Sequence, residues 1–205
     1  LTVMSLAGYV YPNVYGSAAA QSTASLLGTV VMLIVCAPFA SKLAAKFGKK
    51  ELAVASSICS ALVWLGCLIW RPASVWGFVA CYILANIGMG FFNTIIWAMI
   101  TDVIDDAEVR SGIREDGTIY SVYSFARKLG QAFSSGLVGA LLGIIGYTEA
   151  TAFDPAVTRG IFNMACIAPI IGFVCIVLAL VFLYPLNKKK VEENVAALAA
   201  RRNSK

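Results

Sequence analysis

The sequence contains no histidine, and only 13% of its 205 residues are charged. A soluble domain carries about 25% charged residues, so a soluble globular fold is disfavoured. The missing histidine removes the commonest metal ligand and general base. All six cysteines lie in apolar runs without a C-x-x-C pair, which favours packing over a disulfide framework or a metal site. We therefore expect no metal site, no cofactor and no nucleic-acid partner.

Long runs without charge take the place of the missing polar residues. They cover 1–41, 52–70, 72–101, 129–148 and 160–187. A helix needs roughly 20 mostly apolar residues to cross a membrane, and each run is about that length or longer. No alternation of apolar and polar residues, as in a membrane barrel, is visible. The predicted fold class is all-α, a polytopic membrane protein.

Five complete membrane spans are predicted, at roughly 21–41, 51–70, 74–101, 118–146 and 160–184. The predicted organisation is a truncated helix end at 1–15, five spans within 16–186, cytoplasmic loops at 42–50 and 102–117, and a basic tail at 187–205. The first piece is broken near Pro12 and closed by Gly16. Because the chain begins within apolar sequence, we interpret it as a fragment of a longer protein.

Positive charge is divided unevenly between the two sides of these spans. Twelve lysines and arginines fall in 42–50, 102–117 and 187–205, against two on the other side, Arg71 and Arg159. Cytoplasmic loops carry an excess of Lys and Arg. We therefore expect a multi-pass protein of the cell (inner) membrane with a cytoplasmic C-terminus. The basic tail is either a solvated anchor or a segment that binds anionic lipid heads.

The stretch 102–117 concentrates charge of both signs. It contains Asp102, Asp105, Glu108, Arg110, Arg114 and Glu115. Asp102 and Asp105 share a helix face, since residues three apart are neighbours. Alternating signs at this density predict an ion-pair network that acts as a latch when an inner gate moves. The alternative is a solvated linker.

The helix after this stretch carries charge into the membrane. Lys128 lies 11 residues beyond Gly117, which is about 16 Å and near the midplane of a ~30 Å core. A charge there costs at least ~2.5–3.5 kcal/mol unless it is paired or wetted. At 100° per residue a polar stripe, within about 80°, is formed by Ser121, Ser124, Lys128, Gln131 and Ser135. The stripe predicts a face toward water or a partner helix, or else a packing seam; Arg127 lies off it, and its role stays open.

The preceding helix has a second polar stripe. It is formed by Asn86, Gly90, Asn93, Trp97 and Thr101. Two adjacent helices with polar faces predict a shared aqueous pathway. Trp97 is suited either to stack on a sugar ring or to anchor the helix at the membrane interface.

The order of these residues resembles a known family. The stretch reads Asp102-Val-Ile-Asp105, then Glu108, Gly112-Ile-Arg114-Glu115, Gly117, Tyr120-Ser121, Phe125, Lys128 and Gly130, supported by Leu142-Gly143, Gly146-Tyr147 and Phe47-Gly48-Lys49-Lys50. It is similar to the glycoside–pentoside–hexuronide:cation symporters, typified by the melibiose carrier, of the major facilitator superfamily. The resemblance covers about 38–184. The sequence departs from the family at Asp106, where an aromatic is usual, at Ser111, where threonine is usual, and at an inserted-looking Asp116.

The resemblance implies the C-terminal six-helix half of a twelve-helix transporter. Such a protein moves a sugar with Na⁺ or H⁺ by alternating access. Lys128 matches the family's cation-coupling lysine, whose acidic partners lie in the N-terminal half. The expected inner charge network is Asp102, Asp105, Glu108, Arg110, Arg114 and Glu115, and the expected sugar pathway is Asn93, Trp97, Ser121, Ser124 and Gln131. The implied partners are a sugar, a coupling cation, membrane lipid and the N-terminal half.

Two other functions stay open at this point. Asp102 and Asp105 could bind Mg²⁺ in a membrane-embedded phosphotransferase, because acidic pairs suit a hard cation. An enzyme is nevertheless not predicted, because no further aspartates stand on a second helix and Lys128 would have no function. A non-transporting structural membrane protein would leave the two polar stripes unexplained.

Overall fold

The computed structural model describes residues 2–203, and this part of the chain is helical, with no strand in it. The helices are α1 (Thr2–Tyr9), α2 (Ala18–Val31), α3 (Ala37–Phe47), α4 (Lys49–Trp70), α5 (Val75–Ser111), α6 (Asp116–Ile144), α7 (Pro155–Phe182) and α8 (Lys188–Asn203). Two π-helical segments, η1 (Val10–Val14) and η2 (Met32–Cys36), extend α1 and join α2 to α3. Residue 1 of the predicted first segment and residues 204–205 of the predicted tail lie outside the described residues.

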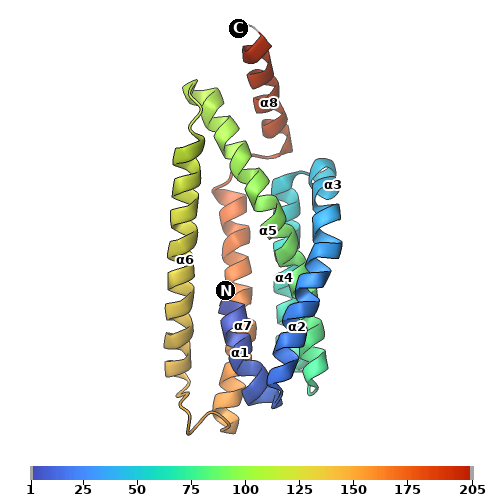
Figure 1. The fold of residues 1–205 in the computed structure, drawn as a ribbon, viewed down its shortest axis with the longest axis vertical. Helices are drawn as coiled ribbons and strands as arrows, with labels where there is room; N and C mark the ends of the chain where they lie inside the picture. The colour runs from blue at the N-terminus through green and yellow to red at the C-terminus, as the bar shows by residue number, and fades with distance from the viewer. Residues whose placement is uncertain (1, 204–205) are drawn as a thin grey trace.

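Four helices are long and apolar enough to cross a membrane, namely Ala18–Phe47, α4, α5 and α7. The first of these joins α2, η2 and α3, and the four run lengthwise through the molecule (Figure 1). The prediction of an all-α polytopic membrane protein is confirmed. The fifth predicted span, α6, has 29 residues, about 44 Å, but the polar side chains near its middle keep it out of this group. Its place in the membrane stays a prediction.

The helix α5 is longer than the predicted span 74–101 and continues to Ser111. The predicted loop 102–117 is therefore mostly helical, and the turn is confined to residues 112–115. No glycine or proline interrupts the added turns. The helix ends at Gly112, whose φ of 77° is the left-handed conformation that favours glycine. The acidic residues of this stretch thus lie on a helix rather than on a loop.

The predicted loop 42–50 is shortened in the same way. The helix α3 ends at Phe47 and α4 begins at Lys49. Gly48 alone separates them, and its φ of 103° is again left-handed. The short turn brings Lys49 to the first position of α4.

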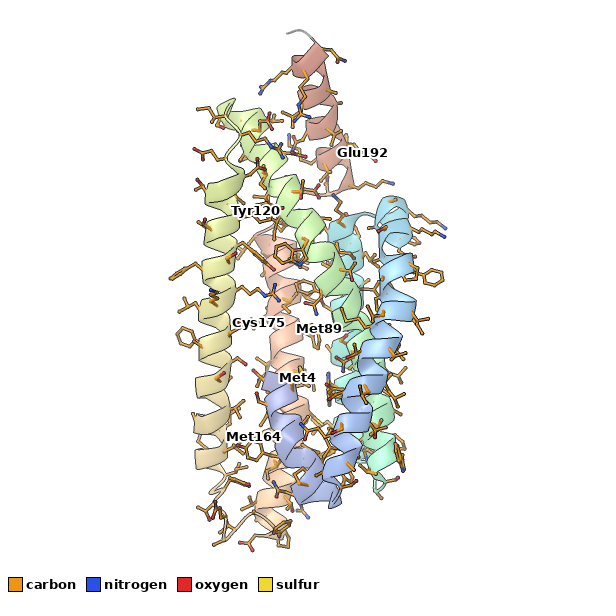
Figure 2. The ribbon with its side chains drawn as sticks, in the orientation of Figure 1. Met4, Met89, Tyr120, Met164, Cys175 and Glu192 are labelled. Carbon is orange, nitrogen blue, oxygen red and sulfur yellow. The ribbon has the colours of Figure 1, made fainter. Side chains whose placement is uncertain are left out.

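The tail helix α8 packs against the end of α5, and we call this end of the molecule the α8 end. Figure 2 marks α8 by Glu192, and both views place it beyond the end of the bundle (Figures 1 and 2). Leu198 of α8 is buried, with 5% of its surface exposed. The predicted tail is therefore largely a docked helix. Its cytoplasmic location and its contact with lipid stay predictions.

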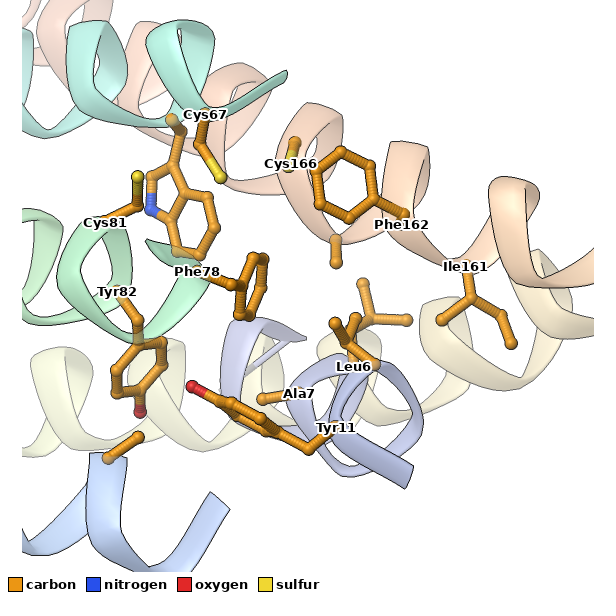
Figure 3. Packing of buried hydrophobic residues seen from close by; sticks show 14 of the residues in the cluster. Leu6, Ala7, Tyr11, Cys67, Phe78, Cys81, Tyr82, Ile161, Phe162 and Cys166 are labelled. Atoms are coloured by element: carbon orange, nitrogen blue, oxygen red, sulfur yellow. The ribbon is translucent and has the colours of Figure 1, made fainter. Parts of the chain in front are cut away.

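The main buried core joins α1, α4, α5 and α7, with Phe78 near its centre (Figure 3). The Phe78 ring centroid lies 5.5 Å from that of Tyr11 and 5.9 Å from that of Phe162. Glycine permits a very close helix contact, because a Cβ at Gly88 of α5 would lie 2.5 Å from the Ser56 carbonyl oxygen on α4. Small residues at such crossings are typical of membrane helices. The helix α6 lies beside this core and contacts α1 and α5.

Candidate functional site

Lys128 lies near the middle of α6, 12 residues after Asp116 and 16 before Ile144. Its side chain is exposed. Among residues 2–203, no hydrogen bond or ion pair holds its ammonium group. Lys128 is therefore an accessible cation at mid-height on a long helix.

The predicted sugar-pathway residues of α6 are accessible as well. Ser121, Ser124 and Gln131 are all exposed. The Ser121 hydroxyl donates to the Gly117 carbonyl at 2.7 Å within the helix. The polar stripe of α6 is thus open along its length.

Trp97 is the centre of an aromatic cluster between α5 and α6. Its side chain is 47% exposed, and its ring centroid lies 5.3 Å from Tyr123, edge-on, and 6.3 Å from Tyr120. The Arg127 guanidinium lies over the same ring, 5.8 Å from the centroid, within the range of cation–π attraction. Figure 2 places Tyr120 between the two helices. We call Trp97, Tyr120, Tyr123 and Arg127 the Trp97 cluster.

The sequence left Arg127 without a role, and the structure brings it to Trp97. A signal for this contact was available, because Trp97 lies 14 residues before Ser111 and Arg127 lies 11 residues after Asp116. Helices joined by a short turn bring such positions to similar heights. Asn93 lies about one turn from Trp97 and is half-buried, and no hydrogen bond or ion pair links it to Lys128 in the described chain.

Arg114 follows the turn at the end of α5 and binds three carboxylates, in what we call the Arg114 cluster. Its guanidinium nitrogens lie 2.8 Å from Glu108 Oε2, 3.0 Å from Asp105 Oδ1 and 2.9 Å from Asp116 Oδ2. These hydrogen bonds, the one to Glu108 first, raise the pKa of Arg114 above its ordinary value. The cluster fastens the turn back onto α5.

Asp102 belongs to a different ion pair. The Lys49 ammonium at the start of α4 lies 2.6 Å from Asp102 Oδ1 and donates to the Ala98 carbonyl at 3.4 Å. Only 5% of the Asp102 side chain is exposed, against 32% for Lys49. In the described chain the second oxygen of Asp102 has no hydrogen-bond partner. The single network predicted from the sequence is therefore divided, because Asp102 lies on the face of α5 that α4 covers.

The contacts of α8 were not predicted from the sequence. Asp106 pairs with Arg110, one turn along α5, at 2.8 Å, and accepts the Asn194 amide of α8 at 2.9 Å. Arg201 donates to two carbonyls in the last turns of α5, where a cation complements the helix dipole. A cavity of about 540 Å³ lies between α5 and α8, and Arg114 lines it.

The acids of this end are not arranged as a shared metal site. Asp102 and Asp105 bind Lys49 and Arg114 respectively, and these basic groups satisfy their charges. Glu115 is exposed and makes no ion pair among residues 2–203. Within the same residues no group of three metal-ligating side chains occurs.

Comparison with known proteins adds a family to this geometry. Residues 1–188 match the family described as MFS/sugar transport protein, where MFS denotes the major facilitator superfamily. A glucuronide carrier protein homolog of Escherichia coli K12 is 29% identical over 180 residues, 86% of this chain and 38% of the relative. A putative sulfoquinovose importer of the same organism is 29% identical over 177 residues, 86% of this chain and 37% of the relative.

A third relative, named "Uncharacterized symporter YjmB", comes from Bacillus subtilis 168. It is 34% identical over 155 residues, 74% of this chain and 33% of the relative. The chain thus spans 33 to 38% of the length of these three relatives. With residues 1–188 matched, this multi-pass membrane chain belongs to the family of MFS/sugar transport proteins.

Proposed function

We propose that this chain is the C-terminal half of a secondary active transporter. In this proposal the complete protein moves a sugar together with Na⁺ or H⁺ by alternating access, rocking two six-helix halves around a site at mid-membrane. The names of the relatives, which include a glucuronide carrier homolog, a sulfoquinovose importer and a symporter, support a sugar and a co-transported ion. The chain is not proposed as an enzyme, because the acids that a transferase would use are occupied by Lys49 and Arg114.

The observation that carries the proposal is the accessible, unpaired Lys128 near the middle of α6. A bare charge at that depth of a bilayer costs at least ~2.5–3.5 kcal/mol, so a carboxylate or water must meet it in the complete protein. We propose that carboxylates from the remaining half hold it. A coupling cation of the same sign would then compete for those carboxylates, which links ion binding to the state of Lys128.

The clusters at the α8 end are proposed to control the inner gate. The Arg114 cluster lies on the surface beside the α8 cavity, where a second half can approach it. Its carboxylates and guanidinium can then exchange partners as the halves move. The Trp97 cluster and the open stripe of α6 form the proposed wall of the sugar pathway.

The test is sugar accumulation by the full-length transporter in membrane vesicles, with and without an imposed Na⁺ or proton gradient. We expect a gradient to drive accumulation and an ionophore to abolish it. Lys128→Ala should lose accumulation while retaining sugar exchange, and Lys128→Arg should rescue poorly, because a planar guanidinium does not replace a compact ammonium. Arg159→Gln, an exposed arginine outside these clusters, is the matched control. Accumulation by Lys128→Ala equal to that of the parent would contradict the coupling role.

A further inference from the structure

Arg127 and Lys128 leave the apolar part of this chain with two cations and no anion. The spans predicted at 21–41, 74–101 and 118–146 contain only these two charged residues. The core of α7 contains none after Arg159. Two positive charges at one height require negative partners, and these must come from outside the described chain.

The two cations differ in how they are held. Lys128 is exposed without a partner among residues 2–203. Arg127 is fixed over the face of Trp97, at 5.8 Å from the ring centroid. Stacking leaves the edge of a guanidinium, with its N–H donors, free to meet a ligand in the ring plane. Trp97 therefore orients Arg127 while its hydrogen-bonding edge remains available.

The surroundings of Arg127 suit a small ligand that carries both a ring and an acid. Trp97 is 47% exposed, so part of its surface is free for the C–H face of a sugar. Tyr120 and Tyr123 contact the same ring, and each adds a phenolic hydroxyl that can donate. No carboxylate in the described chain makes an ion pair with Arg127, so its charge is not already neutralised.

We propose that the Trp97 cluster is an anion subsite and that the transported sugar carries a carboxylate or sulfonate group. This inference rests on the proposed transport function and narrows its substrate class. Arg127 binds the acid group through two parallel N–H···O bonds, a geometry that the guanidinium fork provides and an ammonium does not. Trp97 acts as a positioning residue, because it holds the fork and covers the sugar ring. Lys128 remains free for the coupling carboxylates.

The experiment compares matched probes on the purified full-length transporter. Phenyl β-glucuronide and phenyl β-glucoside differ only at C6, and sulfoquinovose and glucose form a second pair. We expect the parent to bind each acid at least tenfold more tightly than its neutral partner. Arg127→Gln should reduce this ratio by roughly tenfold or more, since a hydrogen bond to a charged group is worth about 1.5–3 kcal/mol, and should leave binding of the neutral sugars unchanged. Arg159→Gln is the control.

Further variants separate this role from a purely structural one. Arg127→Lys should recover only part of the ratio, because it restores the charge without the fork. Trp97→Phe should retain most of the preference, whereas Trp97→Leu should lose it. A parent that binds glucoside as tightly as glucuronide would overturn the proposal. Equal weakening of both probes by Arg127→Gln would also overturn it, and would assign Arg127 to a carboxylate of the remaining half.

The anion subsite and the transport function can fail separately. Gradient-driven accumulation of neutral sugars alone would sustain the transporter and overturn the subsite. Saturable binding of glucuronide that is lost in Arg127→Gln, in a protein that accumulates no sugar, would sustain the subsite and overturn the transport function.

Discussion

Replacing Lys49 should destabilise the protein, because it leaves Asp102 buried without its cation. The Asp102 side chain is 5% exposed, and Lys49 is its one hydrogen-bond partner in the described chain, at 2.6 Å. Breaking a buried ion pair costs about 3–5 kcal/mol. Lys49 is 32% exposed, so solvent screens the pair in part, and we expect about 3 kcal/mol for Lys49→Met. Asp102→Asn should cost less, because the freed ammonium can reach water and keeps the Ala98 carbonyl.

The assay is a double-mutant cycle on the unfolding of the purified full-length transporter. Lys49→Met combined with Asp102→Asn should lose about 1–3 kcal/mol less than the sum of the two single variants, because contacting residues couple. Lys46→Met is the control, since this lysine is exposed and contacts only the neighbouring Phe47 ring through its ammonium. Additive single variants, or a Lys49→Met protein as stable as the parent, would refute the reasoning.

Three further predictions concern the packing, the orientation and the turn. Gly88→Val should destabilise by about 1–3 kcal/mol through overpacking against α4, whereas Gly66→Ala should be tolerated, because nothing lies within 4 Å of its Cβ position; equal melting temperatures would contradict this. Cysteines at Asn187 and Thr151 should be labelled by an impermeant thiol reagent from the cytoplasm and from outside, respectively, and labelling of both from one side would exclude the predicted orientation. Arg114→Gln should slow sugar uptake while sugar binding persists, and uptake at the parent rate would reduce the Arg114 cluster to a solvated turn.

The long helices could be predicted from the sequence because lipid imposes simple rules on length and apolarity. Runs of roughly 20 apolar residues must be helical, and the four apolar spans follow from that. The end of α5 was misplaced because charge was taken as a sign of a loop. The helix in fact continues until Gly112 supplies a left-handed backbone, since Arg110 can bind Asp106 one turn away and support the helix locally.

The ion partners could not be predicted, because they depend on how distant helices pack. Lys49 and Asp102 are 53 positions apart, and the docking of Asn194 on Asp106 spans 88 positions. Charge spacing along one helix contains no information on which neighbour covers it. The contact of Arg127 with Trp97 was more accessible to prediction, because equal distances from one short turn fix equal heights.

The division of the acids into two clusters decides which of them can act in a gate. Lys49 and Asp102 both lie in this chain, on the closely packed helices α4 and α5. A rigid-body rocking of two halves moves both partners together, so this pair stabilises the fold in every state. Arg114 is more exposed, at 37%, and lines the cavity beneath α8, where a partner surface can compete for its carboxylates. Exchanging the charges of Asp102 and Arg114 should therefore not restore function, because the two residues bind different partners, and the moving latch is to be sought in the Arg114 cluster alone.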